Sequence, residues 1–94
     1  MSELVNAAAY ERMIDALRAL EKNTLEITLD VANMTKVVKP AADQGDQVCL
    51  NMTNKMTKVI SGMCDVAEKA QKMRLAMEET LEQLKKLERE SQEE

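Results

Sequence analysis

Apolar side chains recur along this chain at alternating steps of three and four residues, in two long runs that restrict the possible folds severely. The first run covers residues 10–38 with eight of its nine positions apolar, and the second covers 49–87 with eleven of twelve. A 3.5-residue repeat is typical of helices that pack along a seam. The sequence therefore predicts an all-α chain with helices over about residues 4–38 and 48–88, followed by a frayed tail over 89–94.

The composition favours the same fold. The 94 residues include one Tyr and no Phe or Trp, so Leu, Ile, Val, Met and Ala must fill the interior. These side chains suit the thin seam between two helices, whereas the large aromatic residues that fill a thicker core are missing. Two Gly and one Pro leave few places for the turns that a sandwich or barrel needs. A single helical-hairpin domain over residues 1–94 is predicted.

One segment competes with the helical prediction. Residues 24–31 alternate polar and apolar side chains and are rich in β-branched residues, which alone is typical of a strand. Two observations favour a helix instead. The 3.5-residue repeat continues through the segment without a change of phase, and the sequence offers no second strand to pair with its backbone groups. A locally irregular or extended segment stays open as the alternative.

The only proline and one of the two glycines stand between the two runs, within residues 39–47. Pro40 disfavours helical geometry at the residue before it, so the first helix is expected to end near Val38. Gly45 suits a tight reversal, and either aspartate of this segment can cap the start of the second helix. The segment therefore predicts a short turn and an antiparallel hairpin.

A lone hairpin of this kind would leave many apolar side chains in water, because two packed helices bury only one stripe each. Apolar residues also flank the strict repeat, at Ile14, Leu25, Leu29, Leu50, Ile60, Leu75 and Leu81. Exposed apolar patches of this extent mark interaction surfaces, and a four-helix bundle formed with a second copy or a partner would cover them. The residues expected to bind the partner are Tyr10, Ile14, Leu17, Ile27, Val31, Met52, Met56, Val59, Ile60, Met63, Met73, Met77, Leu81 and Leu84.

Sulfur-containing residues occupy seam positions of the second helix. Its five methionines at the repeat spacing are interpreted as adaptable core filling, and the alternative is an adaptable docking surface. Cys49 and Cys64 lie fifteen residues apart, which is about 22 Å along one helix. A disulfide needs Cα atoms within about 7 Å, so the spacing excludes an internal bridge and predicts two free thiols.

Several classes of function lack the residues that they need. The chain has no His for acid–base catalysis or zinc binding and no glycine-rich phosphate loop, so no enzyme activity, cofactor or metal is predicted. Its net charge of −4 disfavours nucleic acid and anionic membranes as partners. No apolar run is long enough for membrane insertion, and the N-terminal residues lack a secretory signal. The protein is expected to be made in the cytoplasm and, if exported, to use a route that reads no cleavable signal.

An acidic chain of this length, with two long helices and a reversal near its middle, resembles the small helical-hairpin proteins of type VII secretion in Gram-positive bacteria. These include the WXG family and the helical partners of LXG-type toxins. The resemblance is architectural and covers about residues 4–87. At the Trp-x-Gly turn of the family this sequence reads Gln44-Gly45-Asp46, where only the glycine matches. At the Tyr-x-x-x-Asp/Glu export signature it retains only the acidic end, Glu88.

The resemblance implies a non-catalytic adaptor or chaperone that docks onto a cognate helical protein, such as the targeting domain of a toxin. The alternative is a structural homo-oligomer, either a helical bundle or a coiled coil, without a role in secretion. Both hypotheses require a protein partner, which is a second copy of the chain in the second case.

Overall fold

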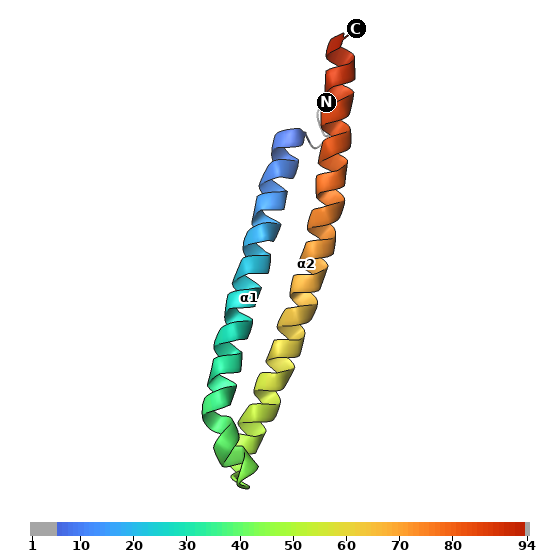
Figure 1. Ribbon diagram of the computed structural model, residues 1–94. Helices are drawn as coiled ribbons and strands as arrows, with labels where there is room; N and C mark the ends of the chain where they lie inside the picture. The colour runs from blue at the N-terminus through green and yellow to red at the C-terminus, as the bar shows by residue number, and fades with distance from the viewer. Residues whose placement is uncertain (1–5, 94) are drawn as a thin grey trace.

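The computed structural model describes residues 6–93, which form two antiparallel α-helices (Figure 1). Helix α1 comprises Ala7–Asp43 and α2 comprises Gln47–Glu93. Together they form an elongated hairpin of 74 × 21 × 14 Å, in which the C-terminal turns of α2 extend past the start of α1. The predicted all-α antiparallel hairpin is confirmed, and residues 24–31 are helical rather than extended.

Helix α1 continues past its predicted end at Val38 and includes Pro40. Proline lacks the N–H that bonds four residues back, and such a residue bends a long helix. The last turns of α1 do bend toward α2 in Figure 1. The predicted end was wrong because two alanines, the strongest helix formers, follow the proline, and Ala42 is buried.

The reversal is made by residues 44–46, a shorter turn than the predicted 39–47. The amides of Gly45 and Asp46 donate hydrogen bonds to carbonyl oxygens in the last turn of α1, each at 3.0 Å. Gly45 has a φ of +100°, in the left-handed region that favours glycine. The Asp46 Oδ1 atom accepts a hydrogen bond from the Cys49 amide at 3.0 Å and caps α2. The predicted reversal at Gly45 with an aspartate cap is confirmed.

At the outer ends of the helices, the end of α2 differs from the prediction. The Asn6 Oδ1 atom accepts a hydrogen bond from the Ala9 amide at 2.9 Å and caps α1. The predicted start near residue 4 lies outside the described residues, as does Glu94. Helix α2 remains helical to Glu93, where a frayed tail was predicted from residue 89. That prediction was wrong because the Glu, Arg and Gln residues of this segment favour helix and neither Gly nor Pro interrupts them.

The two helices pack along a line of buried and half-buried side chains that we call the inner line. On α1 it follows steps of four and three through Tyr10, Ile14, Leu17, Glu21, Thr24, Thr28, Val31, Thr35, Val38 and Ala42. On α2 it follows the same steps through Cys49, Thr53, Met56, Ile60, Met63, Ala67, Ala70, Arg74, Met77, Leu81 and Leu84. In heptad notation the inner line occupies positions a and d of both helices.

The inner line shares only every second position with the predicted seam. Leu20, Ile27 and Met34 belong to the predicted seam of α1, but they are exposed, and the residue after each of them faces α2 instead. The same shift of one residue occurs along α2. Of the flanking residues that were expected to stay in water, Ile14, Ile60 and Leu81 lie on the inner line, while the remaining four leucines are exposed.

Small and polar side chains in the middle of the inner line account for this shift. Thr24 is buried, and its hydroxyl donates to the carbonyl oxygens of Leu20 and Glu21, each at 2.9 Å. The hydroxyl of Thr35 likewise lies 3.0 Å from the Val31 carbonyl. Within residues 6–93, no buried side-chain nitrogen or oxygen lacks a hydrogen-bond partner. Because these hydroxyls are satisfied by their own helix, threonine can face the partner helix without a large desolvation cost.

Candidate functional site

Nine large apolar side chains, each 40–80% exposed, form a surface that we call the apolar face. All nine directly precede an inner-line residue; seven of them occupy heptad position g, and two valines occupy the adjacent position c. The apolar face consists of Leu20, Ile27, Met34 and Val37 on α1 and Val48, Met52, Val59, Val66 and Met73 on α2.

Both helices present these residues on the same side of the hairpin. A two-fold rotation about an axis perpendicular to the plane of two antiparallel helices exchanges them, so the same heptad position of each helix falls on the same side. A hollow on the surface agrees with this geometry. Met13 and Met73, both at position g, line a hollow of about 240 Å³ together with Ala16, Leu17 and Met77. Position g of α1 and position g of α2 therefore meet on the same side of the hairpin.

The opposite side of the hairpin carries ion pairs between the helices. The Arg18 Nη2 and Glu78 Oε2 atoms are 2.6 Å apart, and the Lys85 Nζ and Glu11 Oε1 atoms are 3.4 Å apart. All four residues directly follow an inner-line residue, at heptad position e. Such exposed pairs each contribute about 0.2–1 kcal/mol. This side also carries four exposed leucines, Leu25 and Leu50 at position e and Leu29 and Leu75 at the adjacent position b. The two sides of the hairpin thus differ in that the interhelical ion pairs lie on one and the nine-residue apolar face on the other.

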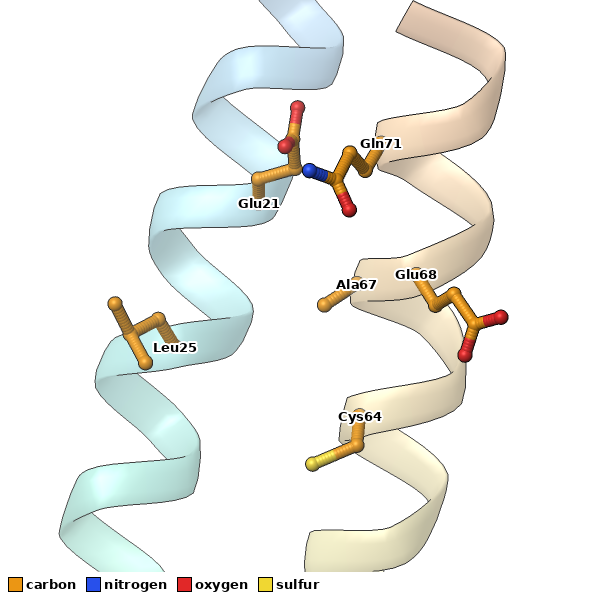
Figure 2. Close-up of a pocket in the computed structure, with 6 residues that line it drawn as sticks. All are labelled: Glu21, Leu25, Cys64, Ala67, Glu68 and Gln71. Atoms are coloured by element: carbon orange, nitrogen blue, oxygen red, sulfur yellow. The ribbon is translucent and has the colours of Figure 1, made fainter.

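A second hollow, of about 430 Å³, opens on the charged side (Figure 2). Figure 2 shows Cys64 and Ala67 pointing toward α1, while the carboxylate of Glu68 points away from the hollow. The small side chain of Ala67 leaves this space between the helices. In Figure 2 the side-chain amide of Gln71 is directed toward Glu21. The residues that line the hollow are Glu21, Leu25, Cys64, Ala67, Glu68 and Gln71.

A charged pair interrupts the inner line near its middle. Arg74 binds Glu21 through two hydrogen bonds, at 2.6 Å from Nε and 3.2 Å from Nη2, and its Nη1 atom lies 3.0 Å from Glu78. The hydrogen bond from Arg74, followed by its charge, holds the pKa of the Glu21 carboxyl below its ordinary value. The bidentate geometry fixes one residue of α1 opposite one residue of α2 and so favours a single register of the hairpin.

The two cysteines are free, as the sequence predicted. Cys49 is half-buried next to the turn, and Cys64 is exposed. Burial, followed by the Asp46 carboxylate, raises the pKa of the Cys49 thiol, so this sulfur stays protonated at neutral pH and reacts slowly. Among residues 6–93, no three acidic or cysteine side chains are grouped so that they could hold a metal ion.

The predicted partner-binding residues divide into two groups in the structure. Ile14 and Met56 are buried between the helices. Tyr10, Leu17, Val31, Ile60, Met63, Met77, Leu81 and Leu84 are half-buried on the inner line. Only four predicted residues lie on the apolar face: Ile27, Met52, Val59 and Met73. The methionines divide between the two positions, since Met56 is buried between the helices and Met52 and Met73 are exposed on the apolar face.

The prediction missed five members of the apolar face. Leu20, Met34, Val37, Val48 and Val66 are exposed there but were not expected to bind a partner. A signal for most of them is present in the sequence, because apolar residues recur at intervals of seven on both helices. The spacing alone could not assign which of the two apolar lines faces the other helix and which faces solvent. Pro40 and Gly45 lie at the turn end of the hairpin, away from the middle of this face.

No family model, curated protein or solved structure matches this chain. The likeness to the hairpin proteins of type VII secretion therefore concerns architecture alone, and no family is assigned. Neither of the two helices, over the range that the structure describes, contains a stretch long and apolar enough to cross a membrane.

Proposed function

We propose that this protein is a non-catalytic docking protein that binds the helices of another polypeptide chain through its apolar face. The observation that carries the proposal is the recurrence of exposed Leu, Ile, Met and Val every seven residues on the same side of both helices. An apolar side chain contributes to stability only when it is removed from water, so these nine exposed side chains do not stabilise the isolated chain. A surface of this kind is typical of a site that another protein covers.

The size of the apolar face fits a protein partner. Full burial of one Leu, Ile, Val or Met side chain contributes about 1.5–3 kcal/mol. The members of the face are 40–80% exposed, so each has about 1 kcal/mol still to gain. Nine of them supply on the order of 9 kcal/mol, a gain comparable with the roughly 4–15 kcal/mol lost when two molecules associate. The affinity then depends on the fit of the partner and on the charges around the face.

The resemblance to type VII hairpin proteins suggests a specific setting for this function. In that setting the protein is an adaptor that packs against the targeting helices of a cognate protein, such as an LXG-type toxin, and leaves the cell with it. The alternative is a homo-oligomeric helical bundle without a role in secretion.

The decisive experiment compares two charged substitutions on one helix. Ile27→Glu places a carboxylate on the apolar face, and Leu25→Glu places one on the charged side, where the native residue is 58% exposed against 44% for Ile27. Each variant is co-expressed with the helical proteins encoded next to this chain, and complexes are measured by size-exclusion chromatography with light scattering. Circular dichroism confirms that both variants keep their helical content.

The proposal predicts that Ile27→Glu removes any complex and that Leu25→Glu keeps it. Loss of the complex in both variants, or in Leu25→Glu alone, would contradict docking through the apolar face. A wild-type protein that stays monomeric with every candidate partner and at every concentration would contradict the docking function itself.

A further inference from the structure

The two outer edges of the apolar face carry opposite charge. On the α1 edge, at heptad positions c and f between residues 16 and 37, the only charged residues are Glu26 and Asp30. The α2 edge, at the same positions between residues 48 and 76, holds four exposed lysines and one aspartate: Lys55, Lys58, Asp65, Lys69 and Lys72. Lys72 also pairs with Glu68 of its own helix at 3.0 Å. The face is therefore acidic along α1 and basic along α2.

Two hairpins can bury this face against each other in two symmetric ways. If their turns lie at the same end, α1 of one copy packs over α2 of the other, and every helix is antiparallel to its neighbours. If their turns lie at opposite ends, α1 packs over α1 and α2 over α2. The first arrangement places each acidic edge beside a basic edge. The second places the lysines of both α2 helices together, which like-charge repulsion disfavours.

We propose that a second copy of this chain covers the apolar face, in a four-helix bundle with both turns at the same end. This inference rests on the proposed function, because it uses the same face, and it names the occupant and its orientation. Glu21 pairs with Arg74 in the hairpin, so Glu26, five residues along, is level with Lys69. In the proposed bundle Glu26 of one copy lies beside Lys69 of the other.

The area available is sufficient for a stable dimer. From Val48 to Met73 on α2 the face covers 25 residues, which is about 38 Å at 1.5 Å per residue. The hairpin is 21 Å across. The product is roughly 800 Å² per copy, close to the ~800 Å² per partner of a standard protein interface. A single docked helix, about 10 Å wide, would leave half of the face uncovered, whereas a second hairpin matches its width.

A distance between the two turns tests the orientation directly. A spin label is attached at Gln44→Cys in a chain that also carries Cys49→Ala and Cys64→Ser, and the label-to-label distance is measured by double electron–electron resonance. Turns at the same end predict a distance of roughly 30 Å or less, since neighbouring helices lie 8–10 Å apart. Turns at opposite ends predict roughly 50 Å, because the centre of the face is about sixteen residues from the turn.

A charge exchange tests the pairing of the edges. Lys69→Glu is expected to weaken the dimer about tenfold or less, as an edge charge does, and the added Glu26→Lys is expected to restore it. Ile27→Glu is expected to abolish the dimer, whereas the matched Leu25→Glu is expected to leave it intact. Light scattering over a dilution series measures the dissociation constant of the dimer for the wild type and for each of these variants.

The long label distance, or a double charge variant that is weaker than Lys69→Glu alone, would overturn the proposed orientation. A chain that is monomeric at all concentrations up to about 100 µM would overturn self-association. If that monomer still binds a helical partner and Ile27→Glu prevents it, the docking function holds and only the identity of the occupant is wrong. If Ile27→Glu changes no association of any kind, the docking function fails as well.

Discussion

Two isoleucines on α1 offer a matched test of which side of the helix packs against α2. Ile14 is 4% exposed on the inner line, and Ile27 is 44% exposed on the apolar face. Truncation to alanine removes the same atoms at both positions and gives the same gain in helix propensity. The difference between Ile14→Ala and Ile27→Ala therefore reports the difference in burial alone.

The expected magnitudes are well separated. Truncation of a buried isoleucine to alanine lowers the free energy of unfolding by about 2–5 kcal/mol. Because a thin two-helix seam can partly collapse around the gap, the loss expected for Ile14→Ala is about 2–3 kcal/mol. Ile27 is already half in water within the isolated hairpin, so Ile27→Ala is expected to change the free energy of unfolding by about 0.5 kcal/mol or less.

Urea denaturation followed by circular dichroism at low protein concentration measures both values. With a slope of about 1.5 kcal/mol per molar urea, Ile14→Ala should lower the midpoint by roughly 1.5 M, and Ile27→Ala should leave it nearly unchanged. At high concentration the Ile27→Ala midpoint should fall below that of the wild type, because the face is then buried between chains. Equal losses at low concentration, or a larger loss at Ile27, would refute the assignment of the inner line.

Two further predictions concern the ion pair and the glycines. Because Arg74 lowers the pKa of the Glu21 carboxyl, the pair stabilises the hairpin at neutral pH, and this contribution is lost as pH falls below the ordinary glutamate pKa and through the lowered one. The urea midpoint should therefore fall more steeply from about pH 5 to pH 3 in the wild type than in Glu21→Gln, and parallel curves would contradict this. Gly45→Ala should destabilise by about 1 kcal/mol, because φ is +100° there although the space is open. Gly62→Ala, helical and equally open, should stabilise by about 1 kcal/mol at low concentration, and thermal unfolding of both distinguishes the signs.

The hairpin itself was predictable from the sequence because its signals are local and repeated. Two uninterrupted 3.5-residue repeats with one break specify two helices and one reversal. Gly45 marks the reversal because only glycine adopts its φ without strain. The prediction ended α1 too early because of Pro40. Proline costs the helix one backbone hydrogen bond, but this cost is smaller than the gain from burying the turn that follows.

The choice of the inward-facing line was not predictable from apolar content. Ile27 and Met34 are more apolar than Thr28 and Thr35, and hydrophobicity alone places the first pair inside. The structure instead places the second pair, half-buried, on the inner line, where their hydroxyls donate to carbonyl oxygens of their own helix. Interactions between the two helices determine which line faces inward. The small Thr and Ala side chains permit close helix packing, and Glu21 accepts two hydrogen bonds from Arg74 across the seam. Neither term can be evaluated without the partner helix.

The reactivity of single cysteines at three neighbouring positions tests the central claim most directly. Leu25→Cys, Ile27→Cys and Thr28→Cys are each made in a chain without Cys49 and Cys64, and the rate of thiol labelling is measured as protein concentration rises or a helical partner is added. The account predicts slow labelling at 28 throughout, fast labelling at 25 throughout, and labelling at 27 that is fast in dilute solution and slow after association. Fast labelling at 28, or protection of 25 in place of 27, would contradict it.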